Sequence, residues 1–372
     1  MQIVIFCHSL LSDWNHGNAH FLRGITTELL SRGHQVRVYE PKDAWSLQNL
    51  LVDAGDSAIA EFQVAYPQLQ SIRYDPSALG LDQALAGANL VLVHEWNDPV
   101  LVQQIGQHRT QAGSYRLLFH DTHHRSVTAP DSMAAYDLTN YDGLLAFGAV
   151  IRDLYLAQGW IKQAWTWHEA ADTRIFHPIG SSECEGDLVW IGNWGDDERT
   201  AELHEFLINP IKALGLKARV YGVRYPQSAQ KALSDAGIEY GGWLPNYQVP
   251  QVFSRFRVTV HVPRCPYAAA LPGIPTIRPF EALACGIPLI SAPWQDAEGL
   301  FTPGQDFLVA PTGEAMQHHL KRLLANPSEA ETLVDHGLQT IRARHTCAHR
   351  VDELLHIYRQ LEEISQAEAL LA

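Results

Sequence analysis

Residues 1–40, MQIVIFCHSLLSDWNHGNAHFLRGITTELLSRGHQVRVYE, decide the fold class. They contain an apolar strand over residues 2–6, a polar loop, an amphipathic helix over 19–31 and a second strand over 35–39. Gly33 follows the helix as a cap before the chain turns into the second strand. This order predicts a βαβ unit with two parallel strands.

The same alternation of strand and helix continues through the first half of the chain. Apolar runs without polar alternation at residues 90–93, 115–119 and 144–147 predict strands that are covered on both faces. One parallel sheet with helices on both sides accounts for them. The sequence therefore predicts the α/β fold class.

A polar stretch with proline and glycine, residues 177–187, interrupts this pattern. A second series of strands and helices begins at residue 188, with strands expected over residues 188–191, 218–221 and 258–262 and a helix over residues 198–208. An amphipathic helix closes the sequence. We therefore expect two α/β domains followed by one helix, over residues 1–177, 178–349 and 350–372.

Composition excludes several classes of protein. The 372 residues are 46% hydrophobic and 18% charged, which is typical of a globular protein. A net charge of −14 argues against binding to nucleic acid or to an anionic membrane surface. No apolar run approaches the roughly 18 residues of a membrane span. The first residues lack the basic segment of a signal peptide, and the five cysteines show no C-x-x-C. We expect a cytoplasmic protein.

Ligands of parallel α/β sheets bind at the loops that follow the strands. The first such loop, residues 8–18, leads into a helix whose free N–H groups can hold an anion or a hydroxyl. It lacks the G-x-G-x-x-G of dinucleotide-binding proteins, and the chain has no Walker-type phosphate loop. The alternative is a solvated loop in which Asn18 caps the helix.

The sequence FHDTHHR, residues 119–125, directly follows a predicted strand. Its three imidazoles beside Asp121 can hydrogen-bond a polar ligand or move a proton. A metal site is a weaker alternative, because His120 and His123 have no further ligands at a recognised spacing. A purely structural histidine is the other alternative.

Two loops of the second half carry cations. In WIGNWGDDER, residues 190–199, Arg199 can reach a phosphate, or it forms a surface ion pair with Glu202 or Asp196. In the second, a glycine loop precedes a helix whose expected first residue is Pro279.

At the start of that helix, free N–H groups, the helix dipole and Arg278 converge on one point suited to a diphosphate. Glu281 can accept hydrogen bonds from a ribose diol, or it complements the helix dipole.

The whole chain resembles the nucleotide-sugar glycosyltransferases of the large "group 1" family, and its second half is most similar to the branch related to spore-maturation proteins. The resemblance lies in HGNAHFLRGITTELLSRGHQVRVYEP, HDTHHR, WIGNWGDDER and IRPFEALACGIPLISAPWQDAEGLFTPGQDFLVA. It implies the GT-B fold: two facing Rossmann-like domains with a cleft between them, and a C-terminal helix that crosses back to the first domain. The first domain would bind the acceptor and the second the nucleotide sugar.

The resemblance also implies roles for individual residues. Expected catalytic residues are His120, Asp121, Arg199 and Arg278. Expected donor contacts are Gly192, Asn193, Arg199, Gly222, Trp243, Gly273, Ile274, Thr276, Arg278 and Glu281. Expected contacts on the acceptor side are His16, Gly17, Asn18, His123 and Arg125. The E-x7-E pattern of the family would place its first acid at position 273, which is glycine here, so the usual carboxylate contact to the donor sugar is missing.

The implied reaction is transfer of a hexose from a UDP- or GDP-sugar to an acceptor hydroxyl, with retention of configuration. Cations and N–H groups would stabilise the leaving diphosphate, so no metal and no cofactor are expected. The D-x-D of metal-dependent transferases is absent from the sequence. Two alternatives are a non-hydrolysing sugar-nucleotide epimerase and a catalytically silent sugar-nucleotide-binding protein. The acceptor (a glycan, a lipid-linked sugar or a protein) and the oligomeric state stay open.

Overall fold

A computed structural model describes residues 1–111, 114–180, 183–195 and 197–371. The chain forms two compact units. Unit 1 comprises Met1–His168 together with Cys347–Ala372, and unit 2 comprises Glu169–Thr346.

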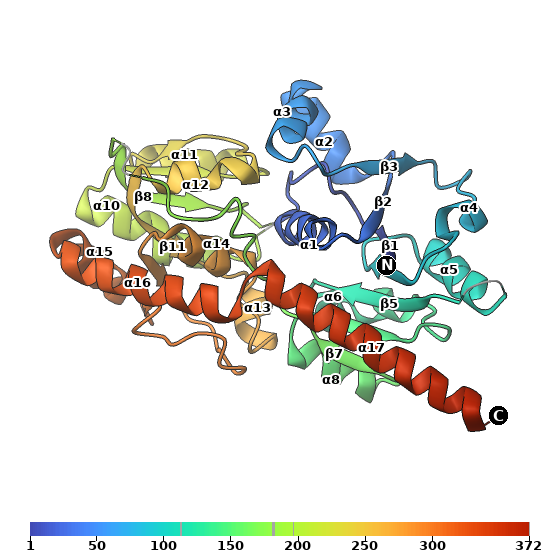
Figure 1. The fold of residues 1–372 in the computed structure, drawn as a ribbon. Coiled ribbons are helices and arrows are strands. Elements are labelled where there is room, and N and C mark those ends of the chain that lie inside the picture. The colour runs from blue at the N-terminus through green and yellow to red at the C-terminus, as the bar shows by residue number, and fades with distance from the viewer. Residues whose placement is uncertain (112–113, 181–182, 196, 372) are drawn as a thin grey trace. The chain divides into compact units, whose positions relative to one another are not determined.

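Unit 1 is built on a parallel sheet of seven strands in the order β3-β2-β1-β4-β5-β6-β7 (Figure 1). The strands are β1 (Gln2–Phe6), β2 (Gln35–Pro41), β3 (Ser71–Tyr74), β4 (Leu90–His94), β5 (Arg116–Asp121), β6 (Gly143–Ala146) and β7 (Ala164–Thr166). Each residue of β4 is buried, which fits a central strand covered on both faces.

Helices cover both faces of this sheet. They are α1 (Ala19–Ser31), α2 (Trp45–Ala54), α3 (Ser57–Ala65), α4 (Leu81–Leu85), α5 (Pro99–Gln111), α6 (Arg125–Thr128), α7 (Pro130–Ala134), α8 (Ala149–Ala157) and α17 (Cys347–Leu371). The last helix, α17, packs beside α1 and against β5. Two ion pairs secure α17 there, Arg32–Asp352 at 2.5 Å and Arg116–Glu362 at 2.5 Å.

Unit 2 contains a parallel sheet of six strands in the order β10-β9-β8-β11-β12-β13. The strands are β8 (Gly186–Ile191), β9 (Ala218–Tyr221), β10 (Glu239–Tyr240), β11 (Phe256–His261), β12 (Leu289–Ser291) and β13 (Leu308–Val309). Its helices are α9 (Thr200–Leu203), a π-helical turn (His204–Ile208), α10 (Asn209–Leu214), α11 (Gln227–Asp235), α12 (Val249–Phe253), α13 (Cys265–Ala270), α14 (Ile277–Cys285), α15 (Gly313–Ala325) and α16 (Pro327–Arg344).

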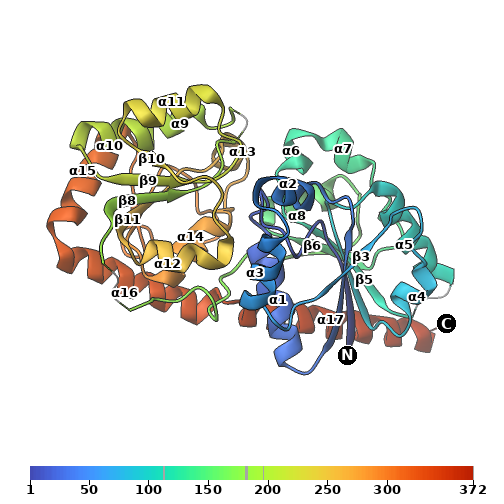
Figure 2. The same ribbon diagram turned by 90° about the horizontal axis from the view of Figure 1, so that it is seen from above.

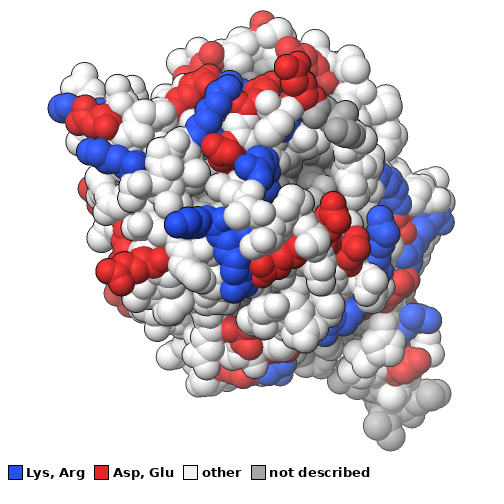
Figure 3. Space-filling view, turned by 90° about the vertical axis from the view of Figure 1, so that its left-hand side faces the viewer, with Lys and Arg blue, Asp and Glu red and all other residues white. Residues whose placement is uncertain are grey.

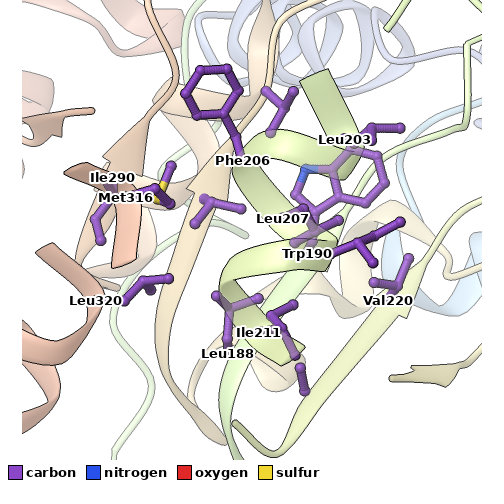
Figure 4. Close-up of a cluster of buried hydrophobic side chains, with 14 of the residues drawn as sticks. Leu188, Trp190, Leu203, Phe206, Leu207, Ile211, Val220, Ile290, Met316 and Leu320 are labelled. Carbon is purple, nitrogen blue, oxygen red and sulfur yellow. The ribbon is translucent and has the colours of Figure 1, made fainter. Parts of the chain in front are cut away.

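In the view of Figure 2, α9, α10 and α11 lie on one side of the β8–β9 strands, and α12 and α14 lie on the other. A hydrophobic core lies between the sheet and the helices α9, α10 and α11 (Figure 4). In it, Trp190 and Leu188 from β8 pack against Leu207 and Ile211. Met316 of α15 belongs to the same cluster. The burial of each side chain of this size stabilises the folded protein by about 1.5–3 kcal/mol.

Several predicted elements differ from the observed ones in detail. The helix expected over residues 198–208 begins at Thr200 and passes through the π-helical turn into α10. Helix α14 begins at Ile277, two residues before the predicted Pro279, which therefore occupies the third helical position. A proline is tolerated there because the N–H groups of the first turn have no partner within the helix.

The surface carries charges of both signs. On the face shown in Figure 3, basic and acidic side chains lie intermixed. Within the described part of the chain, no helix has both the length and the apolar character that crossing a membrane requires.

Candidate functional site

The order of the strands points to one site in each unit. Successive strands are added on one side of β1 and then on the other, so the strand order of unit 1 reverses between β1 and β4. In unit 2 the strand order reverses between β8 and β11. Ligands of doubly wound sheets bind at the carboxyl ends of the strands at this switch point. The segments after β8 and β11 contain most of the predicted donor residues, and HDTHHR begins at the end of β5, beside β4.

Arg199 forms the centre of the site in unit 2. Its guanidinium donates to the carbonyl oxygen of Val262 at 2.8 Å and to that of Asn193, and it lies 5.0 Å from the ring centre of Trp190. The expected alternative of an ion pair with Glu202 is therefore wrong. The other expected partner, Asp196, lies outside the described residues.

Three arginines converge at this point. A side chain added at Gly195 would meet Nε of Arg199 at 3.3 Å and Nε of Arg264 at 3.4 Å, so both guanidinium groups border this glycine. Burial, together with the charges of Arg264 and Arg278, lowers the pKa of Arg199 to about 9. Arg264 contacts Glu198 at 3.3 Å. Such a cluster favours an anion, which would relieve the repulsion between its members.

Sequence reasoning missed Arg264 and a neighbouring histidine. His261, at the end of β11, is buried, and burial together with the charges of Arg199 and Arg278 lowers its pKa to about 3. Its Nδ1 bonds Ser291 at 2.9 Å, and Nε2 has no partner among the described residues. Both residues lie at or just after the end of a strand that the sequence predicts from residue 258. Their position at a strand end could have identified them as candidate site residues.

The predicted glycines of the loops after β8 and β9 allow a close approach of two backbones. A side chain at Gly222 would collide with the carbonyl of Gly192. The side-chain amide of Asn193 stabilises the same contact, because its Oδ1 accepts a hydrogen bond from the N–H of Val223 at 2.9 Å. Trp243 lies half-buried in the loop that follows β10.

Glu281 is completely buried in the first half of α14. Its carboxylate forms an ion pair with Arg278 and accepts a hydrogen bond from Nδ2 of Asn246 at 2.6 Å. Thr276, directly before the helix, has a φ of +61°. The sequence predicted Arg278 and Glu281 as independent ligands of the donor, whereas the structure joins them, with Asn246 as an unpredicted third member.

A carboxylate lies beside Gly273 although position 273 is not an acid. Gly273 has a φ of +93°, and a side chain built there would meet Oε1 of Glu298 at 2.7 Å. Its N–H donates to the carbonyl of Gln295 at 2.6 Å, which holds the two loops together, and the next residue, Ile274, is buried. Glu298 is far along the chain, so no local pattern could have identified it.

An apolar pocket of about 480 Å³ adjoins these loops. It is lined by Glu202, Phe206, Pro263, Cys265, Ala268, Ala269, Ala292, Pro293, Trp294 and Gln295. Pro263 and Cys265 flank Arg264 in the sequence, so one wall of the pocket continues into the arginine cluster.

The loop after β1 in unit 1 is buried, so the alternative of a solvated loop is wrong. The buried carboxylate of Glu40 accepts hydrogen bonds from Oγ of Ser9 at 3.0 Å and from the N–H of Leu10 at 2.6 Å. Asn18 precedes α1, but its side chain makes no capping hydrogen bond. Of the residues expected on the acceptor side, His16 and Asn18 are buried and Gly17 is exposed.

His120 and Asp121 end β5 in a buried environment. Burial lowers the pKa of His120 to about 3, so its imidazole is neutral at neutral pH and can form a hydrogen bond with a polar ligand. Asp121 accepts hydrogen bonds from the hydroxyl of Tyr155 at 2.8 Å and from the N–H of His123 at 3.0 Å. Burial raises the pKa of this carboxyl group.

The end of β4 contributes residues that sequence reasoning missed. Arg125, expected on the acceptor side, forms an ion pair with the buried carboxylate of Glu95. His94 bonds Thr122 at 2.9 Å, and its ring centre lies 5.2 Å from that of His120. The signal was present, because the polar sequence HEW directly follows the apolar residues 90–93.

In the ranges that the structure describes, no group of three or more His, Cys, Asp or Glu side chains is arranged to hold a metal ion. This statement covers HDTHHR. The expectation that the reaction needs no metal stays a prediction.

Comparison with known proteins relates part of the chain to glycosyltransferases by sequence. The family described as "Glycosyl transferase-like" matches residues 199–356. No protein with a curated description matches the chain in sequence.

Solved structures match over nearly the whole chain. A sucrose-phosphate synthase from Thermosynechococcus elongatus superposes with a TM-score of 0.68 at 15% identity, covering 98% of this chain and 100% of its own. The Anabaena protein HepE in complex with UDP-glucose gives 0.66 at 12% identity, with 99% and 100% covered. An alpha-glucosyltransferase in complex with UDP and DNA gives 0.68 at 11% identity, with 96% and 100% covered. These matches confirm the predicted GT-B fold.

Proposed function

We propose that this protein is a glycosyltransferase that moves a hexose from a nucleoside-diphosphate sugar to an acceptor hydroxyl, with retention of configuration and without a metal ion. Unit 2 would bind the donor and unit 1 the acceptor. We place it in the branch related to spore-maturation proteins and in the cytoplasm. The glycosyl transferase-like match and the GT-B fold support the general activity.

One observation carries the proposal: Arg199 is partly buried beside two other arginines and donates only to backbone carbonyls among the described residues. A partly buried guanidinium that is bound by no acid among these residues is unfavourable, and a diphosphate would supply a negative charge. Negative charge grows on the diphosphate as the glycosidic bond breaks, so cations held in place before the reaction lower the barrier. This electrostatic role is the one that a metal ion has in other transferases.

The remaining donor contacts follow from the same loops. Glu281 would accept hydrogen bonds from the ribose, because a carboxylate oxygen can accept more than one hydrogen bond. Glu298 would take the sugar hydroxyls in place of an acid at position 273. UDP and UDP-glucose in similar structures support a nucleotide-sugar donor, which would be a UDP- or GDP-sugar.

The acceptor side would use His120, whose neutral imidazole can accept a hydrogen bond from the attacking hydroxyl and orient it. Asp121 does not need to move a proton itself. It accepts hydrogen bonds from Tyr155 and from the backbone after His120, which fixes the strand end.

A thermal-shift screen against UDP, GDP, dTDP, ADP and CMP, run in parallel with EDTA and without it, tests the donor site. A ligand at a hundredfold excess over its Kd stabilises the folded state by about 2.7 kcal/mol. We expect one diphosphate to raise the Tm clearly and CMP to have no effect. The absence of any shift would contradict the donor site, and a shift that EDTA abolishes would contradict metal independence.

A second assay separates transfer from the alternatives. The nucleotide that stabilises the protein is supplied as its glucose, galactose and mannose derivatives, and products are identified by mass and by NMR of the sugar. Release of the nucleoside diphosphate supports a transferase, whereas an isomerised sugar nucleotide of unchanged mass would indicate an epimerase. Binding without either product would indicate a catalytically silent protein.

A further inference from the structure

Trp96 is an exposed tryptophan whose orientation is fixed from several sides. It follows β4 at the switch point of unit 1, and 40% of its surface is exposed. The guanidinium of Arg125 lies 4.1 Å from its ring centre, and the His123 ring packs against it at 5.0 Å and 74°. Arg125 is itself held by the carboxylate and the carbonyl oxygen of Glu95. The exposed ring is therefore a rigid surface.

A row of imidazole rings extends from Trp96 along the ends of the neighbouring strands. The ring centre of His8 lies 6.2 Å from that of Trp96 and 5.3 Å from that of His16. His94 follows 6.4 Å from His16, and His120 lies 5.2 Å beyond it. The row thus leads from the exposed tryptophan into the buried interior of the site.

Three of these imidazoles have an unused ring nitrogen. Nε2 of His16, Nδ1 of His94 and Nε2 of His120 are buried and have no hydrogen-bond partner among the described residues. A buried polar group without a partner is unfavourable, and three in one row indicate that a polar ligand or water completes them. Burial lowers the pKa of each of the three rings, so they are neutral at neutral pH and present both donors and acceptors.

The charges around this row show what kind of ligand fits. The cations that adjoin it are both bound to acids: Arg23 contacts Asp13 at 2.8 Å, and Arg125 contacts Glu95. Asp121 adds a further acid at the end of β5. The site therefore has no excess of positive charge, which excludes a phosphate or carboxylate as its preferred ligand. Neutral donors and acceptors beside an aromatic surface match the hydroxyl groups and the C–H face of an uncharged sugar ring.

We propose that this surface, made of Trp96, His8, His16, His94 and His120, is a binding site for an uncharged carbohydrate, whose ring stacks on Trp96. Together with the proposed function, on which this assignment rests, the carbohydrate is the acceptor. The acceptor hydroxyl then belongs to a sugar, and not to a serine side chain, a lipid alcohol or a lipid phosphate.

The test measures carbohydrate binding directly by saturation-transfer NMR on the full chain without donor. The probes are methyl glucosides, galactosides and mannosides, and disaccharides of the same sugars, with octanol, a serine-containing peptide and inorganic phosphate as comparisons. Trp96→Ala removes the stacking ring and Trp96→Phe keeps an aromatic one. Trp45→Ala is the matched control, because Trp45 is a similarly exposed tryptophan of unit 1, at the start of α2.

We expect at least one saccharide to bind the wild type and Trp45→Ala equally, and to bind Trp96→Ala about tenfold more weakly. Trp96→Phe should retain most of the affinity, and phosphate should not compete. Equal binding to Trp96→Ala and Trp45→Ala, binding of no saccharide in the panel, or preference for octanol or the peptide would each overturn the proposal.

The donor site is tested separately on the same variants by the rise in Tm with UDP and GDP. If neither nucleotide stabilises any variant but saccharide binding depends on Trp96, the transferase function fails and the carbohydrate site stands. If a nucleotide stabilises every variant but saccharide binding does not depend on Trp96, the carbohydrate site fails and the donor site stands.

Discussion

Replacing Arg199 by methionine tests whether this residue exists for a ligand or for stability. Methionine is apolar and similar in length, so it fills the space over Trp190 without a charge. The pKa of Arg199 is lowered from 12.5 to about 9, which corresponds to about 5 kcal/mol by which burial and the neighbouring arginines disfavour its charge. The variant relieves this unfavourable charge. It also loses two charge-assisted hydrogen bonds, to Val262 and Asn193, of about 1.5–3 kcal/mol each.

The two effects nearly cancel, because about 5 kcal/mol is offset by a loss of about 3–6 kcal/mol. The unliganded variant should therefore differ from wild type by less than about 2 kcal/mol, unlike a buried ion-pair arginine, whose removal costs about 3–5 kcal/mol. Binding of the diphosphate should weaken by about 30-fold or more, since at least one charge-assisted bond to it is lost. The stabilising effect of UDP or GDP should largely disappear.

The assay is thermal unfolding with and without the nucleotide, supported by titration calorimetry. Arg219→Met is the control, because Arg219 lies in the same unit and is bound by Glu185 at 2.7 Å and by Glu239 at 2.9 Å. That variant should keep the full response to the nucleotide. A strongly destabilised Arg199→Met protein that still responds to the nucleotide would refute the reasoning, because Arg199 would then be a structural residue.

Three further predictions concern other parts of the two sites. Glu281→Gln should weaken nucleotide binding in calorimetry. It should also lower the free energy of unfolding by about 1–3 kcal/mol, because Arg278 loses the charge of its ion-pair partner. Unchanged affinity would remove this residue from the donor site. His120→Gln should reduce the pH dependence of unfolding in urea. The folded-state pKa of His120 is about 3, so as the pH falls below 6.5 this imidazole is protonated only in the unfolded chain. The free energy of unfolding of the wild type therefore falls by about 2 kcal/mol between pH 7 and pH 5 through this residue, and the variant keeps that contribution. An equal loss in both proteins would contradict this. Gly222→Ala should destabilise the protein by about 1–3 kcal/mol through its collision with the Gly192 carbonyl and weaken nucleotide binding, whereas Gly180→Ala, which meets nothing within 4 Å, should do neither; equal effects would show that the close approach is not required.

The elements that sequence reasoning located best are those with a uniform apolar pattern. Strand β1, helix α1 and strand β9 begin and end at the predicted residues, because their apolar spacing is unbroken and their flanking residues are polar. The helix expected over residues 198–208 was predicted to end before Pro210, whereas the helical segment continues through α10. Proline lacks the N–H of the next helical bond, and a π-helical turn precedes it.

The candidate site could be predicted only where the ligand groups lie on loops after strands. This rule selected Arg199, Arg278 and His120, which lie at or soon after strand ends and whose roles in binding stay predictions. It could not find Glu298, whose position beside Gly273 depends on the packing of two distant loops. It also treated Glu281 as open to a ligand, because the ion pair with Arg278 appears only when the helix is built.

The chain passes from unit 1 into unit 2 and returns, and the two crossing segments are held together at both ends. In unit 2, Ala171 pairs with Thr346, and its N–H donates to the carbonyl of His345 at 2.9 Å. In unit 1, Nε1 of Trp167 donates to the carbonyl of Arg350 at 2.8 Å, and Nε of Arg350 donates to the carbonyl of His168 at 2.8 Å. Unit 2 is thus an insertion whose first and last residues are neighbours.

This arrangement sets an order for folding during synthesis. Domains fold as units while the chain leaves the ribosome. Unit 2 is complete once Thr346 has emerged, but unit 1 still lacks α17 at that moment. Val351, Leu354, Ile357 and Leu361 of α17 are buried in the finished protein, so the nascent unit 1 keeps an uncovered apolar face until the last helix arrives. The part of the protein that is made first is therefore the part that finishes folding last.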